Sequence, residues 1–156
     1  MTSIYISKGN KILLLYRQGS RVVNNLWIGS AGGHFEEYEL NSPQHCVLRE
    51  LKEEINIEEN QIENLSLRYI TLRRTADEIR QNYYYFATLK DDIDEDIISN
   101  EGDLEWFDYT EIKDLPMPFT AKYVMKHYLE VGKENDFIYC GIADGEKVIF
   151  TSMPKF

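Results

Sequence analysis

The chain has 156 residues, of which 43% are hydrophobic and 28% are charged, and its formal net charge at pH 7 is -10. This length fits one domain, and the composition is that of a globular protein, which excludes the disordered and fibrous classes. No apolar run approaches the roughly 20 residues that span a bilayer, and the start carries no signal-peptide pattern, so we expect a cytoplasmic protein without a membrane partner. The acidic balance also argues against a nucleic-acid polymer as partner, because a basic surface supplies most of that affinity.

The chain opens with two short runs that are rich in β-branched and aromatic residues, Ile4–Ile6 and Ile12–Tyr16. Gly9-Asn10 between them is a turn signal, so we expect a hairpin or two adjacent strands. Within the second run, Ile12–Leu15 is continuously apolar, which is typical of a strand covered on both faces.

A polar loop, Gln18–Asn25, is predicted next, and Leu26-Trp27-Ile28 then leads into Gly29, Gly32 and Gly33. Glycine lets the backbone turn sharply and approach a ligand or ion closely. The glycine cluster therefore predicts that the backbone approaches a ligand or ion closely in this segment.

The clearest predicted helix runs from Pro43 to Ile55. Ser42 is the expected N-cap, proline suits the first helical position, and Asn56 tolerates the left-handed conformation that often ends a helix.

Beyond this helix the pattern alternates between β and α. We expect two strands, Leu65–Thr71 and Asn82–Leu89, to be paired or adjacent. They are followed by an acidic loop, Asp91–Gly102, and a short strand, Leu104–Phe107. A second helix is expected over Thr120–Glu130. The tail predicts a hairpin, Phe137–Ala143 with Lys147–Thr151, around Asp144-Gly145. This hairpin either extends the sheet or mediates a homodimer.

Three glutamates of the predicted helix, Glu50, Glu53 and Glu54, occupy positions i, i+3 and i+4 and so share one stripe. Leu48, Leu51 and Ile55 fall on the opposite side. Such a stripe is either a solvated acidic face or a site where a hard divalent cation neutralises like charges that repel one another.

The surrounding residues resemble the catalytic box of the Nudix hydrolases. That box reads glycine, five residues, glutamate, seven residues, then Arg-Glu-apolar-x-Glu-Glu-x-Gly-apolar. In this chain it spans residues 33–57, from Gly33 through Glu39 to Arg49 and on to Ile57. Two elements differ: nine residues separate Glu39 from Arg49, with Leu40-Asn41 as the simplest insertion, and Asn56 replaces the last glycine.

The resemblance implies an α/β/α sandwich with a mixed β-sheet over residues 1–131, extended by the C-terminal hairpin in residues 132–156. It also implies a metal-dependent pyrophosphohydrolase that uses Mg²⁺ or Mn²⁺ to cleave a diphosphate linkage in a small-molecule nucleotide. By position, the metal ligands would be Glu50, Glu53, Glu54 and the carbonyl of Gly32.

Catalytic roles carried over from the resemblance fall to Glu50, Glu53, Arg49 and a glutamate from a later loop. Glu101 is the best candidate for that loop glutamate, and Glu105 is the runner-up. Substrate-binding roles are assigned to Glu39, and to Arg17 for a phosphate; Arg21, Arg73 and Arg74 could also reach a phosphate.

The substrate stays open between 8-oxo-dGTP, an ADP-ribose-type compound, a dinucleoside polyphosphate and other nucleoside triphosphates. Some relatives read oxidised guanine with an asparagine near the last helix, and residues 115–120 contain none. The alternative to an enzyme is a catalytically silent Nudix-fold module that binds a nucleotide.

Overall fold

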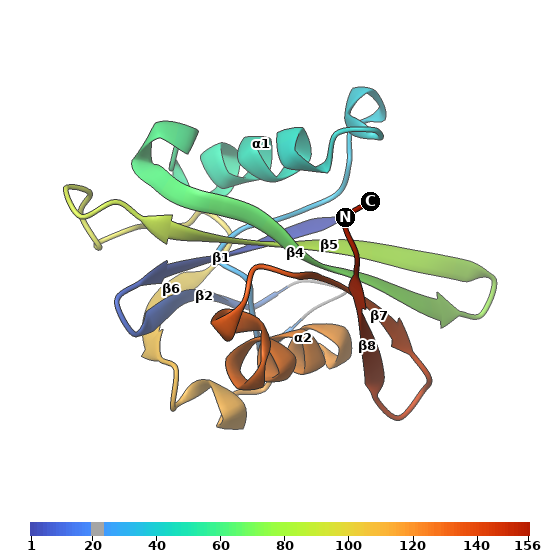
Figure 1. Ribbon diagram of the computed structural model, residues 1–156. Coiled ribbons are helices and arrows are strands. Elements are labelled where there is room, and N and C mark those ends of the chain that lie inside the picture. The colour runs from blue at the N-terminus through green and yellow to red at the C-terminus, as the bar shows by residue number, and fades with distance from the viewer. Residues whose placement is uncertain (20–23) are drawn as a thin grey trace.

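The computed structural model describes residues 1–19 and 24–156, which form one mixed β-sheet with a helix on each face (Figure 1). Across the sheet the described strands run in the order β3-β2-β1-β5-β4-β7-β8, and β6 pairs with β2. The β1–β5 and β4–β7 pairs are parallel, whereas the other pairs are antiparallel. The predicted α/β/α sandwich with a mixed sheet is confirmed.

The strands are β1 (Thr2–Lys8), β2 (Lys11–Arg17), β3 (Leu26–Ile28), β4 (Ile62–Thr75), β5 (Glu78–Leu89), β6 (Asp103–Asp108), β7 (Ile138–Ala143) and β8 (Val148–Met153). The helices are α1 (Pro43–Ile55) and α2 (Phe119–Glu130). Single 3₁₀ turns are η1 (Glu37–Glu39), η2 (Glu59–Gln61), η3 (Ile112–Asp114) and η4 (Gly132–Glu134). Within the described ranges, no helix has the length and apolar character that a membrane crossing demands.

The first two strands form the expected hairpin, with Lys8 opposite Lys11 and Gly9 at a φ of 58° in the turn. Residues 12–15 are at most 1% exposed, because the sheet is covered on both faces at this point. The doubly covered strand is thereby confirmed. The predicted loop Gln18–Asn25 includes residues 20–23, which lie outside the described part of the chain.

Helix α1 covers one face of the sheet and buries Val47, Leu51 and Ile55 against an aliphatic cluster that includes Ile4, Ile6 and Leu13. It ends as predicted, with Asn56 in the left-handed region at φ 54° and ψ 36°. Ser42 occupies the N-cap position, but its side chain makes no capping hydrogen bond. The start of α1 therefore depends on Pro43 and on packing more than on a serine cap.

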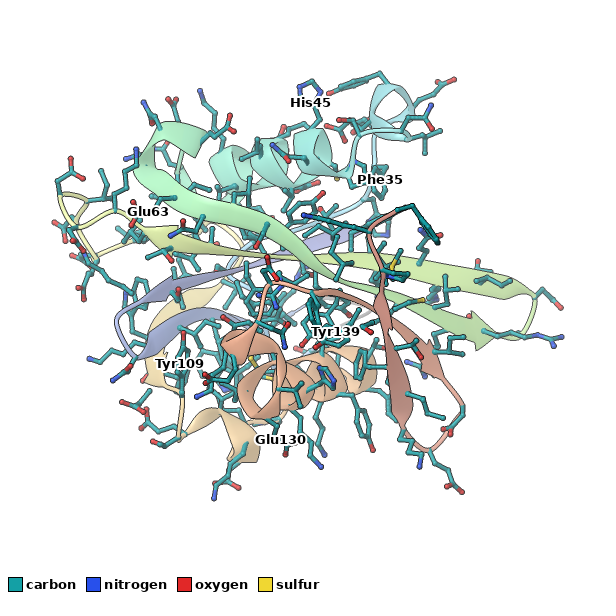
Figure 2. The ribbon with its side chains drawn as sticks, in the orientation of Figure 1. Phe35, His45, Glu63, Tyr109, Glu130 and Tyr139 are labelled. Carbon is teal, nitrogen blue, oxygen red and sulfur yellow. The ribbon has the colours of Figure 1, made fainter. Side chains whose placement is uncertain are left out.

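Helix α2 covers the other face, where the core is mainly aromatic. Val124 and Met125 pack among Tyr5, Tyr69 and Tyr139, and Tyr139 lies between the sheet and α2 (Figure 2). The two faces of one sheet thus have different chemistry: branched aliphatic side chains under α1, and rings under α2.

The C-terminal hairpin extends the sheet. Strand β7 pairs in parallel with β4, with Tyr69 opposite Tyr139, and β8 pairs with β7. The Asp144 carboxylate accepts hydrogen bonds from the backbone N–H groups of Glu146 and Lys147 and so closes the turn. A division of the chain at residue 131, and a homodimer through this hairpin, stay predictions.

Candidate active site

The glycine-rich segment after β3 runs beside the start of β1. The Thr2 N–H donates to the Gly33 carbonyl at 2.8 Å, and Ala31 accepts from Ile4 at 2.9 Å. Gly32 has a φ of 148°, and a Cβ there would collide with the Thr2 carbonyl; on Gly33 it would collide with the Glu50 carboxylate. The segment can pass between β1 and α1 only because these side chains are absent. This close approach is to protein atoms, and an approach to a ligand or ion stays a prediction.

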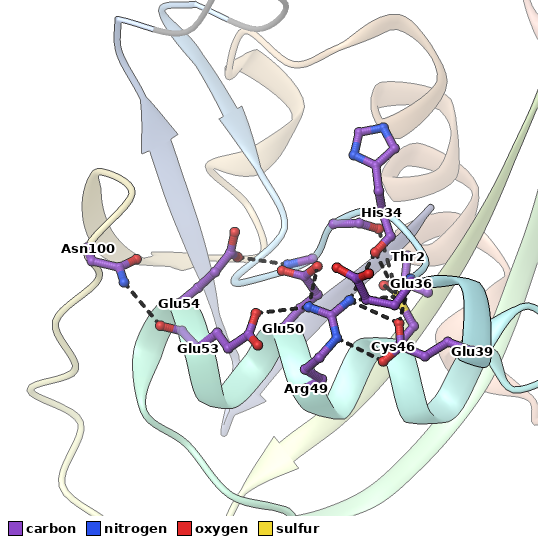
Figure 3. Close-up of polar contacts among 12 residues, drawn as sticks. Thr2, His34, Glu36, Glu39, Cys46, Arg49, Glu50, Glu53, Glu54 and Asn100 are labelled. Atoms are coloured by element: carbon purple, nitrogen blue, oxygen red, sulfur yellow. Dashed lines mark hydrogen bonds and ion pairs between the residues drawn. The ribbon is translucent and has the colours of Figure 1, made fainter.

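The glutamate stripe of α1 faces this segment (Figure 3). The Glu54 carboxylate accepts a hydrogen bond from the Gly32 N–H at 2.9 Å, and the Glu50 side chain is only 12% exposed. Glu53, at 58% exposure, lies at the rim and pairs with Arg49 at 2.8 Å. The structure therefore brings Glu50 and Glu54 inside and leaves Glu53 outside.

Arg49 connects the loop before α1 to the helix. Its guanidinium donates to both carboxylate oxygens of Glu39, at 2.8 and 3.0 Å, and to the His34 carbonyl at 3.0 Å. It also lies 3.0 Å from the Glu50 carboxylate. The hydrogen bonds from Arg49 hold the pKa of buried Glu39 at about 2, against the opposing effect of burial.

The extra residues Leu40-Asn41 do not displace Glu39 from this network. Turn η1 folds the chain back, with the Glu36 N–H donating to the Glu39 carboxylate at 3.0 Å, and Leu40 lies 65% exposed. The insertion is thus absorbed by an exposed turn before the helix. A substrate-binding role for Glu39 stays a prediction; its contacts favour anchoring of Arg49.

Glu54 has the opposite electrostatic environment. Burial raises its pKa to about 7, and the nearby carboxylates of Glu50 and Glu101 add to the shift, while the Gly32 N–H opposes it. A carboxylate that is half-buried near two others is stabilised as an anion only when a cation lies close to it.

The later loop brings Glu101 to the same place. The Arg17 guanidinium donates to the Glu101 carboxylate at 2.8 Å. The adjacent Asn100 donates its backbone N–H to the Glu54 carbonyl at 3.2 Å and its side-chain N–H to the Glu53 carbonyl at 3.1 Å. Glu105, the runner-up, lies exposed on β6 opposite Leu14. Sequence reasoning missed Asn100, for which only its position beside Glu101 was a signal.

A cleft of about 890 Å³ joins these groups to the face of the sheet under α2. One end carries Glu50, Glu54 and Glu101, with Arg17 at the edge. Toward the first turn of α2, the lining includes Tyr5, Asn82, Tyr84 and Thr120 together with Arg73; Glu78 and Arg80 line the cleft as well. Sequence reasoning missed Asn82 and Thr120 as well; the alternation of β5 places Asn82 on the same face as Tyr84.

The remaining arginine candidates lie apart from the glutamates. Arg73 lines the α2 end of the cleft, with its guanidinium 5.3 Å from the Phe119 ring centre, and Arg74 borders a separate small hollow. Arg21 falls outside the described residues.

Within residues 1–19 and 24–156, no three acidic, imidazole or thiol side chains converge as a ready-made metal cage. The donors at the acidic end are nevertheless carboxylate oxygens, which hard cations such as Mg²⁺ and Mn²⁺ prefer. Burial raises the pKa of Glu54 even though Arg17 lies nearby, so a further positive charge would stabilise its anion. The residues present therefore fit a divalent cation. Glu53 contributes its carboxylate only if it releases its ion pair with Arg49.

The chain is similar over most of its length to solved structures. A mutator MutT protein from Bacillus halodurans is 24% identical, with 99% of this chain and 97% of that one covered and a TM-score of 0.67. The E. coli dihydroneopterin triphosphate pyrophosphohydrolase is 18% identical, with 83% and 92% covered and a TM-score of 0.62. An Ap4A hydrolase from C. elegans is 16% identical, with 86% and 96% covered and a TM-score of 0.64. At these identities the likeness concerns the fold.

Family membership rests on a direct sequence match. The model of the NUDIX domain family matches residues 2–128, which include the glycine segment, the glutamate helix and Glu101. The chain belongs to the NUDIX family.

Proposed function

We propose that this protein is a divalent-metal-dependent pyrophosphohydrolase that cleaves a diphosphate linkage in a nucleoside di- or triphosphate or a nucleoside diphosphate derivative. The family as a whole acts on nucleotide derivatives. The observation that carries the proposal is the grouping of Glu50, Glu54 and Glu101 at one end of the cleft, where the pKa of Glu54 is raised to about 7. A diphosphate bound there needs a cation between its oxygens and these carboxylates.

In the proposed reaction, the groups that would hold Mg²⁺ or Mn²⁺ are the Gly32 carbonyl and the carboxylates of Glu50, Glu53 and Glu54. A bound metal ion neutralises phosphate charge and lowers the pKa of a coordinated water. Glu101 or Glu50 accepts the proton of the attacking water, since both carboxylates face the acidic end of the cleft.

Arginines set the geometry around these carboxylates. Arg49 orients Glu50 and Glu53, and its own position is fixed by the buried Glu39 carboxylate. Arg17 neutralises a phosphate oxygen once its present partner, Glu101, turns to the water or the metal.

The α2 end of the cleft supports a nucleoside as the organic part of the substrate. The nearly buried rings of Tyr5 and Tyr84 form the floor of this end, and Thr120 contributes a hydroxyl. The Asn82 Oδ1 atom is buried without a hydrogen-bond partner in the described residues. A buried acceptor without a donor is costly, so we propose that an N–H group of the base satisfies it after a small rotation of the amide.

The substrate class is not narrowed further than this. The names of the similar structures include a dihydroneopterin triphosphate pyrophosphohydrolase and an Ap4A hydrolase, so this fold serves substrates of different size. The candidates remain 8-oxo-dGTP, an ADP-ribose-type compound, a dinucleoside polyphosphate and other nucleoside triphosphates.

The test is a panel of these nucleotides incubated with the protein and Mg²⁺ or Mn²⁺, with products resolved by chromatography. We expect release of a nucleoside monophosphate or a phosphate product from at least one compound. Glu53→Gln should lower the rate roughly 100-fold or more without unfolding the protein. Glu63→Gln, an exposed glutamate on β4, is the matched control. Full activity of Glu53→Gln would contradict this metal site, and tight binding without turnover would favour a silent module.

A further inference from the structure

The acidic segment 91–102 leaves the sheet after β5 and returns to it at β6. Its first half is held close to the sheet, where the Ile93 carbonyl accepts from Lys8 Nζ at 3.1 Å and the Glu95 carbonyl accepts from Trp106 Nε1 at 2.9 Å. Its second half crosses to the end of α1 (Figure 3). There the segment contacts the helix through Asn100.

The contact occurs at atoms that the helix itself leaves without partners. The last four carbonyls of an α-helix accept no hydrogen bond within it. In α1, the Lys52 carbonyl accepts from the Asn56 N–H. The carbonyls of Glu53 and Glu54 instead accept from the side chain and the backbone of Asn100.

These two carbonyls belong to the residues that carry the proposed metal-binding carboxylates. Asn100 is adjacent in the chain to Glu101, and the Glu101 N–H donates to Ser99 Oγ at 3.0 Å. The side chain of Glu101 is held from the opposite side by Arg17. The backbone of Glu101 is therefore fixed relative to the last turn of α1 by hydrogen bonds of its immediate neighbours.

We propose that Asn100 is a positioning residue, which sets the distance between the Glu101 carboxylate and the carboxylates of α1 by capping the carbonyls of Glu53 and Glu54. This inference rests on the proposed function, because it assumes that these carboxylates act on one metal and one substrate. Groups that orient metal ligands are worth about 10- to 100-fold in metal affinity or activity. A carboxylate delivered by a loop needs such an attachment, since loops hold a site less well than helices and strands do.

Asn100→Ala removes the side-chain donor, and Asn100→Asp replaces it with a charge that faces a carbonyl oxygen. Both should speed amide hydrogen exchange in peptides that cover residues 96–102 in the metal-free protein. Both should also weaken Mn²⁺ binding, measured by calorimetry, about tenfold, with the larger loss in Asn100→Asp. For the substrate found by the panel, kcat should fall more than KM rises.

Asp94→Ala is the matched control, because the Asp94 carboxylate accepts from the Asp96 N–H within the same segment and at 2.9 Å. It should free the Asp96 amide, which loses its acceptor, but leave Mn²⁺ affinity and exchange in residues 98–102 unchanged. Asn100 is exposed, so we expect both variants to fold. Should either unfold, Asn100→Ser, which keeps a shorter donor, replaces it in the same measurements.

Two results would overturn the proposal. One is unchanged exchange in residues 96–102; the other is a lower melting temperature with unchanged Mn²⁺ affinity, which would make Asn100 a helix cap and nothing more. The proposed function fails separately, if the wild-type protein hydrolyses no nucleotide. In that case the exchange measurement still reports whether Asn100 holds the segment.

Discussion

Glu39 and Glu54 belong to the same sequence box, yet the structure gives them opposite electrostatic environments. Glu39, in the turn before α1, is 1% exposed and is bonded through both carboxylate oxygens to Arg49, which lowers its pKa to about 2. Glu54, in the last turn of α1, is half-buried near Glu50 and Glu101, and its pKa is raised to about 7.

The comparison separates a carboxylate that is already neutralised from one that is not. Glu39 has a guanidinium of its own, so it contributes to the fold and needs no ligand. Glu54 has a backbone N–H and two like-charged neighbours, so its anionic form is costly until a cation arrives. Burial alone does not distinguish a structural acid from a functional one; the partner of the acid does.

The sharpest way to break the comparison is Glu54→Gln. Because this carboxylate is proposed to hold the metal, kcat for the substrate should fall by roughly 100- to 1,000-fold. The metal-free variant should be at least as stable as the wild type, because a like charge is removed. The measurements are steady-state kinetics and urea unfolding. A large loss of stability would mean that Glu54 is a structural acid like Glu39.

Glu39→Gln should have the reverse outcome of Glu54→Gln, with a large loss of stability and a small change in metal affinity. It removes the main partner of the Arg49 guanidinium, which is only 19% exposed and keeps Glu50 and Glu53 beside it. We therefore expect a loss of about 2 kcal/mol of unfolding free energy. Urea unfolding tests this loss, and calorimetry with Mn²⁺ should show a smaller change in metal affinity than Glu54→Gln does. Unchanged stability would refute the anchoring role.

The two glutamates should also give the metal-free protein opposite pH dependences. The lowered pKa of Glu39 gives stability that is present above its unfolded value of 4.5 and is lost as the pH falls toward 2. The raised pKa of Glu54 makes the folded protein hold a proton that the unfolded chain releases, so stability falls as the pH rises from 4.5 to about 7.

Urea unfolding midpoints measured between about pH 3 and pH 8 test these windows. Mg²⁺ should raise the midpoint more above pH 7 than at pH 5, because the metal competes with the Glu54 proton below pH 7. In Glu54→Gln the fall between pH 4.5 and pH 7 should disappear. Equal stabilisation by Mg²⁺ at both pH values would contradict the assignment of Glu54 as a ligand.

The smallest expected effect concerns Asn82, a neutral residue that lines the same cleft. Among the described residues, the buried Asn82 Oδ1 atom has no hydrogen-bond partner. Asn82→Leu should raise KM for the preferred nucleotide about fivefold to tenfold and leave kcat nearly unchanged. Asn60→Leu is the control, since Asn60 lies exposed in η2 and does not line the cleft. The same KM in both variants would remove Asn82 from the nucleoside end.

Local pattern was sufficient for most of the fold. The apolar run of β2, the turn at Gly9-Asn10 and the proline start of α1 are short-range features, and each was found where the sequence predicts it. Helical periodicity placed the three glutamates on one stripe, because the spacing of residues along a helix fixes the side on which each side chain projects. Local pattern could not show that the tail extends the sheet. That depends on the pairing of β7 with β4, a strand far away in the sequence.

By itself, the sequence determined the family box, the acidic stripe and the elements that carry them, since all depend on residues close together in the chain. The tertiary structure alone decided which acids are neutralised. The position of one guanidinium separates Glu39 from Glu54. The crossing of a loop brings Glu101, but not Glu105, to the acidic end of the cleft, and Asn82 lines the same cleft from β5. The pKa of a carboxyl depends on charges and burial within a few ångströms of it, and those neighbours come from distant parts of the chain.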